Sequence, residues 1–326
     1  MKLSSILLGS SAKFPTIPFF EPNEFRSMSY NIYIGGDQVD DGTAFQKHIA
    51  RVNPDVLSIQ EAGNASVLQS RLENLGFTDF YGPGGNFGQY FASKHPIVYN
   101  TTMTNVDWSR NPLYTEVDIN GYLIGVASIH LDSNCSGFCR EADFENNEPF
   151  EPSAQRRCVQ LYQIMSFLND RKIANSDLDA IIIQGDYNLA HNELNVLEYT
   201  EALGDETLPS GMSYPIDNRQ VPFKQFESFS GSLSLDTTNA HNGDFYTWWP
   251  PPLNPNPIQN NFPVRIDYIA YDGGLTLIEG EILNSISDSS FPEKGIRKYG
   301  SSLAENDGYI ASDHLPVVAD FRIENE

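Results

Sequence analysis

The chain has 326 residues, of which 40% are hydrophobic and 12% aromatic, so its composition supports a substantial core and excludes a disordered chain. Acidic residues outnumber basic ones 43 to 20, which gives a formal net charge of −23. Such a charge disfavours polyanionic partners, because nucleic-acid binding draws most of its affinity from Lys and Arg on phosphates. It is compatible with a metal cofactor and with a cationic or zwitterionic substrate.

The first 25 residues differ from the rest and are predicted to form a leader or N-terminal arm. One positive charge at Lys2 precedes a short apolar patch and small residues, a pattern typical of a secretory signal. Three Asn-x-Ser/Thr acceptors also suit an extracellular protein: Asn64, Asn100 and Asn134. No linker divides residues 26–326, so we expect a single domain, and a monomer, from this part.

Short apolar strands alternate with a few amphipathic helices along the chain. Strands are predicted at Phe25–Asn31, Val56–Glu61, Tyr90–Ala92, Thr115–Ile119, Tyr122–His130, Ala180–Ile183, Val264–Ala270 and Leu315–Phe321. Helices are predicted at Thr43–Val52, after the N-cap Asn64, and at Ala154–Arg171. This order predicts one α/β domain whose sheets are covered by helices.

Several of these elements carry more specific predictions. The first strand alternates apolar and polar residues and is expected to be half-buried, whereas Ala180–Ile183 is β-branched and is expected to be buried on both faces. Asn120-Gly121 predicts a hairpin turn. Tyr90–Ala92 and Thr115–Ile119 are expected to be neighbouring strands, and residues 82–88, which are rich in glycine, to form a loop.

Polar residues recur at the ends of these strands or just beside them. They are Asn31, Glu61, His130, Asp186, Asn188, Asp267, Asp313 and His314. Each one taken singly is compatible with a structural role, such as a solvated strand end or a hydrogen-bonded core histidine. Five strands that all end in this way are hard to explain by packing, and the residues would converge on one rim if the strands share a sheet system.

These residue types suit the metal-assisted hydrolysis of a phosphate ester. Mg²⁺, or another divalent cation such as Mn²⁺, prefers carboxylate and amide oxygens, which Glu61, Asn31 and Asp313 offer. A histidine supplies a base near neutral pH, and Asp267 could hold it in the right tautomer. Asp186 and Asn188 would orient the water and stabilise the transition-state oxygens.

The motifs, taken in order, resemble those of the endonuclease/exonuclease/phosphatase superfamily, which has the DNase I-like fold. The resemblance is carried by Ser29-Tyr30-Asn31, Ile59-Gln60-Glu61, Ile129-His130-Leu131, Gly185-Asp186-Tyr187-Asn188, Arg265-Ile266-Asp267-Tyr268 and Ser312-Asp313-His314-Leu315-Pro316-Val317. It implies a four-layer α/β sandwich of two packed, mainly antiparallel sheets flanked by helices. It also implies that Glu61 binds the metal with support from Asn31 and Asp313. The implied general base is His314 paired with Asp267, with His130 as a second catalytic histidine and Asp186 and Asn188 at the scissile phosphate.

Within the superfamily, the segment after His130 and the Thr247-Trp248 stretch are similar to neutral and bacterial sphingomyelinases. That resemblance implies hydrolysis of sphingomyelin, or a related choline phospholipid, to ceramide and phosphocholine, with transient contact to a membrane surface. It also implies that Cys135 pairs with Cys139 or Cys158. Phosphocholine carries a quaternary ammonium that aromatic faces hold, and the candidates are Trp248, Trp249 and Tyr187, although the Trp-Trp-Pro-Pro run also suits a packed loop.

Other substrates within the superfamily remain open. Residues 271–311 lack the aromatic hairpin with which bacterial sphingomyelinases enter a membrane. Soluble phosphodiesters therefore remain open as alternative substrates. A DNase I-like endonuclease would need a basic rim, so nucleic acid is disfavoured by the net charge. An inositol-polyphosphate phosphatase would carry a Trp-Cys-Asp-Arg pattern where this chain has Val264-Arg265-Ile266-Asp267. A non-enzymatic binding protein of this fold should have lost catalytic residues, and none is missing from the set.

Overall fold

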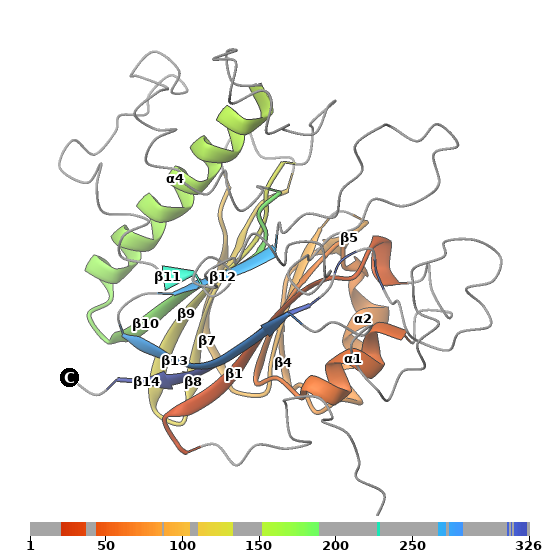
Figure 1. Cartoon of the computed structure of the whole chain (residues 1–326), viewed down its shortest axis with the longest axis horizontal. Helices are drawn as coiled ribbons and strands as arrows, with labels where there is room; N and C mark the ends of the chain where they lie inside the picture. Colours follow the sequence, from red (N-terminus) through yellow and green to blue (C-terminus); the bar gives the residue numbers. More distant parts are fainter. Residues whose placement is uncertain are drawn as a thin grey trace, which may run out of the picture.

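The computed structural model describes residues 21–36, 44–86, 88–104, 110–132, 152–188, 227–228, 267–271, 274–282, 312, 314 and 316–324. Two six-stranded sheets pack against each other, and helices lie on their outer sides (Figure 1). The predicted four-layer α/β sandwich is therefore confirmed. Within the described residues, no helix combines the length and the apolar character needed to cross a membrane.

The first sheet has the strand order β13-β14-β1-β2-β6-β4. Its strands are β1 (Glu24–Asn31), β2 (Val56–Gln60), β4 (Asp79–Tyr81), β6 (Gln89–Ser93), β13 (Leu275–Ile282) and β14 (Val317–Ile323). Helices α1 (Ala44–Val52) and α2 (Ala65–Glu73) belong to this half of the molecule, together with the short 3₁₀ turn η1 (Ile34–Gly36). A separate two-residue ladder joins β3 (Gly63–Asn64) to β5 (Gly84–Gly85).

The second sheet has the order β11-β12-β10-β9-β8-β7. Its strands are β7 (Ile97–Thr102), β8 (Leu113–Ile119), β9 (Tyr122–His130), β10 (Leu178–Asp186), β11 (Glu227–Ser228) and β12 (Asp267–Tyr271). The long helix α4 (Pro152–Ala174) lies along its outer face, as Figure 1 shows in green.

Each sheet contains one parallel pair of strands among antiparallel neighbours. The parallel pairs are β1 with β2 and β9 with β10, while β14 and β12 run antiparallel to β1 and β10. The carboxyl ends of the parallel strands therefore share an edge of their sheet with the amino end of β14 or β12. This topology brings residues from six strand ends to one rim.

Three apolar clusters hold the layers together. Between the sheets, the fully buried Phe25, Val126 and Ile182 belong to one cluster. On the outer faces, α1 and α2 contribute Phe45 and Leu68 to a second cluster, and α4 contributes residues such as Ile164 to a third. At roughly 25 cal/mol for each Å² of apolar surface buried, these clusters are the main source of folding free energy.

The predicted local signals are confirmed at several positions. The Asn64 side chain accepts the backbone N–H groups of Ser66 and Val67 at 3.0 and 3.1 Å and so caps α2. Asn120 and Gly121 have φ of 56° and 94° and close the β8–β9 hairpin, as a type I′ turn requires. Residues 180–183 lie inside β10 and all are buried.

Other predictions about the strands were wrong. The strand from Phe25 is buried on both faces and not half-buried, because its polar side faces the second sheet instead of solvent. β6 and β8 lie in different sheets and do not pair with each other. The predicted loop at residues 82–88 contains β5. Strands β7 and β13 were not predicted. β7 is an edge strand with three exposed residues in succession, so it lacks the alternation that marks a half-buried strand.

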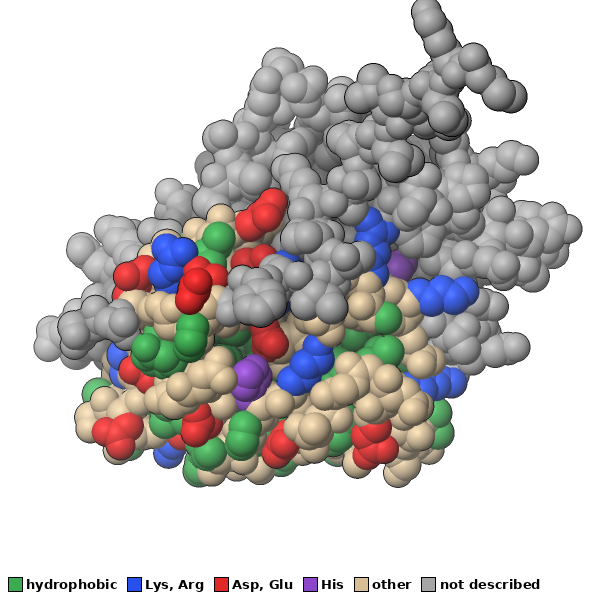
Figure 2. Space-filling view, turned by 90° about the horizontal axis from the view of Figure 1, so that it is seen from below, with side chains coloured by type: hydrophobic (Ala, Val, Ile, Leu, Met, Phe, Trp, Pro, Cys, Tyr) green, Lys and Arg blue, Asp and Glu red, His purple; other side chains and the backbone are tan. Residues whose placement is uncertain are grey.

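The charged surface of the described residues is mixed. On the face shown in Figure 2, Asp and Glu side chains are interspersed with Lys and Arg, and no stripe of basic residues crosses the described part of that face. The excess of acidic residues in the sequence is thus not offset by a local basic surface there.

Candidate active site

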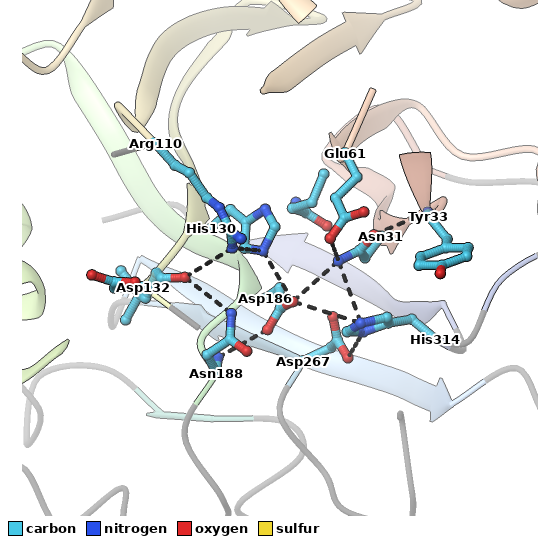
Figure 3. Close-up of polar contacts among 12 residues, drawn as sticks. Asn31, Tyr33, Glu61, Arg110, His130, Asp132, Asp186, Asn188, Asp267 and His314 are labelled. Atoms are coloured by element: carbon cyan, nitrogen blue, oxygen red, sulfur yellow. Dashed lines mark hydrogen bonds and ion pairs between the residues drawn. The ribbon is translucent and has the colours of Figure 1, made fainter. Parts of the chain in front are cut away.

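Seven of the predicted site residues lie together at the rim, at or beside the ends of strands from both sheets (Figure 3). Asn31, His130 and Asp186 are the last residues of β1, β9 and β10, and Asp267 is the first residue of β12. Glu61 directly follows β2, and His314 precedes β14. In the second sheet, Asp186 pairs in register with both His130 and Asp267, so three of these side chains are fixed by the ladder itself.

Asn31 joins the two sheets at the centre of the site. Its Nδ2 donates to Asp186 Oδ2 at 3.1 Å and lies 3.4 Å from His314 Nε2 and 3.5 Å from Glu61 Oε1. Its Oδ1 accepts the backbone N–H of Tyr33 at 3.1 Å, which orients the amide with its nitrogen toward the acidic groups. The side chain is 1% exposed, so this arrangement is held by its contacts and not by solvent.

His314 and Asp267 form a buried pair across the rim. His314 Nδ1 lies 2.8 Å from Asp267 Oδ2, and His314 Nε2 lies 3.7 Å from Asp186 Oδ2. The backbone of His314 is tied to β1 through Ser312, whose hydroxyl accepts the His314 N–H at 3.1 Å and donates to the Asn31 carbonyl at 2.6 Å. A histidine held at Nδ1 by a carboxylate presents Nε2 in a defined direction, as a general base requires.

His130 occupies the other side of Asp186. Its Nε2 lies 3.4 Å from Asp186 Oδ2 and contacts the guanidinium of Arg110, which also donates to the Leu131 carbonyl at 3.3 Å. Burial lowers the pKa of His130 well below its usual range, and electrostatic interactions with Arg110 and His314 lower it further. His130 is therefore neutral near pH 7.

Asp186 titrates far from the ordinary range of a carboxyl group. Burial raises the pKa of Asp186 to about 7, and the negative charge of Asp267 adds to this, against the opposing effects of His314, the Asn188 N–H and Arg110. Asn188, with φ of 49°, donates its N–H to Asp186 Oδ1 at 2.9 Å and its Nδ2 to the Leu131 carbonyl at 3.0 Å. A strained residue that holds a buried carboxylate is typical of a functional site.

Glu61 is held by an unusual backbone. It has φ of 54°, and its carboxylate Oε2 accepts the N–H of Ile34 at 3.0 Å. The donor belongs to a run of four residues with positive φ, which are Tyr33, Ile34, Gly35 and Gly36 at 55°, 48°, 81° and 72°. Such a conformation costs roughly 1–2 kcal/mol for each non-glycine residue, so the backbone that positions this carboxylate lowers the stability of the fold.

The donor set fits a divalent cation. Glu61 and Asp186 lie beside Asn31, and Asp267 is close enough to Asp186 for its charge to add to the effect of burial in raising the pKa of Asp186. Oxygen atoms of Asp186 and Asp267 and a nitrogen of His314 lie within 4.8 Å of one another, a spacing that could itself hold an ion. We favour the Glu61 side, because His314 is already bonded to Asp267 and carboxylate oxygens suit Mg²⁺. Asn31 would need to turn its amide to offer oxygen.

One predicted residue lies away from this site, and several others lie outside the described residues. Tyr187 is 1% exposed, its hydroxyl donates to the Ile183 carbonyl at 3.0 Å, and its ring packs against Tyr268. It lies in the core beneath α4, so the prediction that it binds substrate was wrong, because a buried ring cannot stack on a ligand. Asp313, Trp248, Trp249, Cys135 and Cys139 lie outside the described residues, and so does the side chain of Cys158.

Arg110 is the residue at the site that the sequence did not predict. It follows no strand and belongs to none of the quoted motifs, and its position at the rim depends on its contacts with His130 and Leu131. The sequence feature that could have identified it is a basic residue in a strongly acidic chain, three residues before the buried strand β8. That signal alone is weak.

The two packed sheets and their rim of carboxylate, amide and imidazole groups define an α/β sandwich of the DNase I-like class. Residues 28–314 match the model of the Endonuclease/Exonuclease/phosphatase family, and the chain belongs to that family. A comparison with curated protein sequences gives no match.

Solved structures share the fold at low sequence identity. TDP2 from C. elegans is 16% identical with a TM-score of 0.57, over 94% of this chain and 77% of that one. The human Nocturnin catalytic domain with bound sulfate is 16% identical with a TM-score of 0.54, over 94% and 96%. ANGEL2, a 2′,3′-cyclic phosphatase, is 19% identical with a TM-score of 0.57, over 93% and 96%. These likenesses support the fold, and none of the three proteins is a sphingomyelinase.

Proposed function

We propose that this chain is a divalent-cation-dependent phosphodiester hydrolase that uses water as its nucleophile. The observation that carries the proposal is the His314–Asp267 pair, with Nδ1 and Oδ2 2.8 Å apart, in which His314 Nε2 faces Asp186 Oδ2 at 3.7 Å and Asn31 Nδ2 at 3.4 Å. The arrangement combines a candidate base, the carboxylate that orients it, and the acidic and amide groups that a phosphate and a cation would meet.

His314 would accept the proton of the attacking water at Nε2. Asp267 keeps the Nδ1 proton in place and stabilises the imidazolium that forms. Asp186, whose Oδ2 lies 3.4 Å from His130 Nε2 and 3.7 Å from His314 Nε2, would accept a hydrogen bond from the same water. General-base catalysis of this kind contributes typically about 10²–10⁴-fold to the rate.

The substrate phosphate would be bound by groups that donate hydrogen bonds. Arg110 supplies a positive charge beside His130, and Asn188 supplies an amide beside Asp186. Because His130 is neutral, it would stabilise the leaving oxygen through a hydrogen bond and not through a full proton transfer. Glu61, Asn31 and Asp313 would hold the cation, which when bound offsets charge on the phosphoryl oxygens.

For the substrate, we propose a soluble phosphodiester and keep sphingomyelin as the second candidate. The fold is shared with ANGEL2, a 2′,3′-cyclic phosphatase, and one of the three aromatic candidates for choline binding, Tyr187, is buried. Sphingomyelin is favoured by the motif resemblance around His130 and Trp248. The net charge of −23 disfavours long nucleic acids as substrates.

A substrate panel tests this proposal. The purified chain would be given bis-p-nitrophenyl phosphate, a short DNA oligonucleotide, a 2′,3′-cyclic nucleotide and sphingomyelin in mixed micelles, each with Mg²⁺ and with chelator. We expect hydrolysis that requires the metal, with a water-soluble substrate preferred. Phosphocholine release with the soluble substrates intact would establish the second candidate. No hydrolysis of any substrate with Mg²⁺ or Mn²⁺ would contradict the proposed function.

A further inference from the structure

Beneath the site, a chain of buried hydrogen bonds crosses the space between the two sheets. We call it the Ser–Gln layer, and it consists of Ser27, Ser58, Ser128 and Gln184. The Ser27 hydroxyl donates to Gln184 Oε1 at 2.5 Å, and Gln184 Nε2 donates to Ser58 Oγ at 2.7 Å. The hydroxyls of Ser58 and Ser128 lie 2.5 Å apart. Ser27 and Ser58 belong to the first sheet and the other two to the second, so all three bonds join one sheet to the other.

The Ser–Gln layer lies on four of the six strands that carry the site, which are β1, β2, β9 and β10. Gln184 pairs in register with Ser128, and two residues further on Asp186 pairs with His130. Because side chains alternate along a strand, Gln184 and Asp186 point to the same face. On the first sheet, Ser27 precedes Asn31 on β1 by an even number of residues and shares its face in the same way. The layer thus lies directly beneath the site residues, on the same faces of the same strands.

The hydrogen bonds of the Ser–Gln layer differ from apolar contacts because they are directional. Apolar contacts are non-directional, and they tolerate small sliding of one surface over another. A hydrogen bond weakens steeply when its angle departs from linearity. Each of the four side chains is at most 1% exposed, so no water competes for these bonds. Two serine hydroxyls from opposite sheets also touch only where the strands approach more closely than the usual spacing of about 10 Å.

The site needs such a constraint because it is divided between the sheets. Asn31 belongs to the first sheet and donates to Asp186 on the second, and His314 beside the first sheet pairs with Asp267 on the second. Sliding of the sheets would separate both pairs. Gln184 takes part in two of the three bonds of the Ser–Gln layer, through Oε1 and Nε2, and it stands two residues before Asp186.

We propose that Gln184 is a positioning residue that fixes the offset of the two sheets and, through it, the spacing of the Asn31–Asp186 and His314–Asp267 pairs. Its kinetic consequence rests on the proposed hydrolase function. The role is exerted through other side chains, since Gln184 is fully buried and does not meet the substrate.

The test replaces Gln184 by Met, which keeps the length of the side chain and removes both bonds. We expect kcat to fall roughly 10- to 100-fold, the effect of a misplacement of about 1 Å, while KM stays near the wild-type value. Ser27→Ala, which removes only the bond to Oε1, should give a smaller loss in the same direction and serves if Gln184→Met does not fold. The double variant should lose less than the product of the two single losses, because both act on one network.

Ile182→Val is the matched control, since Ile182 lies on the same strand and face, two residues below Gln184, in the apolar cluster. It is expected to lower stability by about 0.5–1.5 kcal/mol and to leave kcat unchanged. An unchanged kcat in Gln184→Met, or an equal loss of kcat in Ile182→Val at the same change in Tm, would overturn the proposal.

A second measurement does not depend on activity. The His314 Nδ1 proton, bonded to Asp267, should give a downfield ¹H NMR signal that shifts or broadens in Gln184→Met and stays in place in Ile182→Val. The same signal in all three proteins would contradict the positioning role. If the wild-type chain hydrolyses no phosphodiester, the proposed function fails, and this signal still decides the role of Gln184.

Discussion

The space between the two sheets has a lower and an upper region that are equally buried and chemically opposite. In the lower region, Phe25, Val126 and Ile182 are 0% exposed. In the upper region, Asn31, His130 and Asp186 are 1% exposed and lie on the same three strands, β1, β9 and β10. A few residues along each strand thus separate a hydrophobic contact from an ionisable group.

This difference shows how the fold divides its tasks. Burial of apolar groups stabilises the lower region, whereas burial of carboxylates and imidazoles costs free energy unless they are paired. The upper region carries this cost, since burial raises the pKa of Asp186 to about 7 and the negative charge of Asp267 adds to the effect. The lower region should therefore carry stability and the upper region activity, and variants in each region can separate the two.

The largest effect is expected for Asp186→Asn in the upper region. Activity should fall by at least about 10²-fold, because the carboxylate between the two histidines is lost. At a pH near or above 7, the variant should instead be more stable than the wild-type chain. The folded-state pKa of Asp186, about 7, lies above its ordinary value of 3.8, so the carboxyl binds its proton more tightly in the folded state. Its contribution to stability is present below the ordinary value and is lost as the pH rises toward 7.

Thermal unfolding measured in the presence of chelator would test the direction of this change in stability. Above pH 7, Asp186→Asn should have a higher Tm than the wild-type chain, and the difference should shrink toward pH 4. Mg²⁺ should raise the wild-type Tm more than that of the variant, because a cation offsets the same repulsion. If the Asp186→Asn variant is less stable than the wild-type chain at pH 8 in chelator, the conclusion that the upper region lowers folding stability is wrong.

The next effect is expected for Ile182→Ala in the lower region. Truncating this fully buried side chain should destabilise the fold by about 2–5 kcal/mol, as the loss of apolar contacts and the resulting cavity predict. Denaturant unfolding measures the loss, and kcat measured well below the new Tm should stay near the wild-type value. A large loss of kcat in a folded protein would show that the lower region also sets the site geometry.

A smaller effect is expected for Arg110→Met, which removes a positive charge from the upper region. We expect kcat/KM to fall by about 10²-fold, since one donor to the phosphate is lost, and the dependence of kcat/KM on salt to weaken. Burial, the larger cause, would still keep His130 neutral. The matched control is Arg322→Met, whose Arg322 forms an exposed pair with Glu24. Equal kcat/KM in the two variants would exclude Arg110 from the site.

The sequence predicted the upper region better than the lower one. Asp186, Asp267 and His314 could be identified because polar residues at the ends of apolar strands are unexpected, and because the order of their motifs resembles a family. Their mutual contacts follow from strand register. Arg110 could not be identified, because only the tertiary fold brings it to His130.

The Ser–Gln layer could not be predicted for a different reason. Alternation in the first strand normally means that its polar side faces water, and Ser27 fits that pattern. In the structure this side faces the second sheet, and Gln184 supplies its partner from more than 150 residues away. A periodic pattern shows which residues share a face of a strand, but it does not show what lies opposite that face.

The proposed role of the His314–Asp267 pair as the base of a metal-dependent hydrolase is tested most directly by comparison with a second histidine–aspartate pair. His95 lies 3.6 Å from Asp55, outside the site. The measurement is kcat for the preferred phosphodiester with saturating Mg²⁺ in His314→Ala and His95→Ala. We predict a loss of at least about 10²-fold in His314→Ala and wild-type activity in His95→Ala. Wild-type activity in a folded His314→Ala variant would contradict the account.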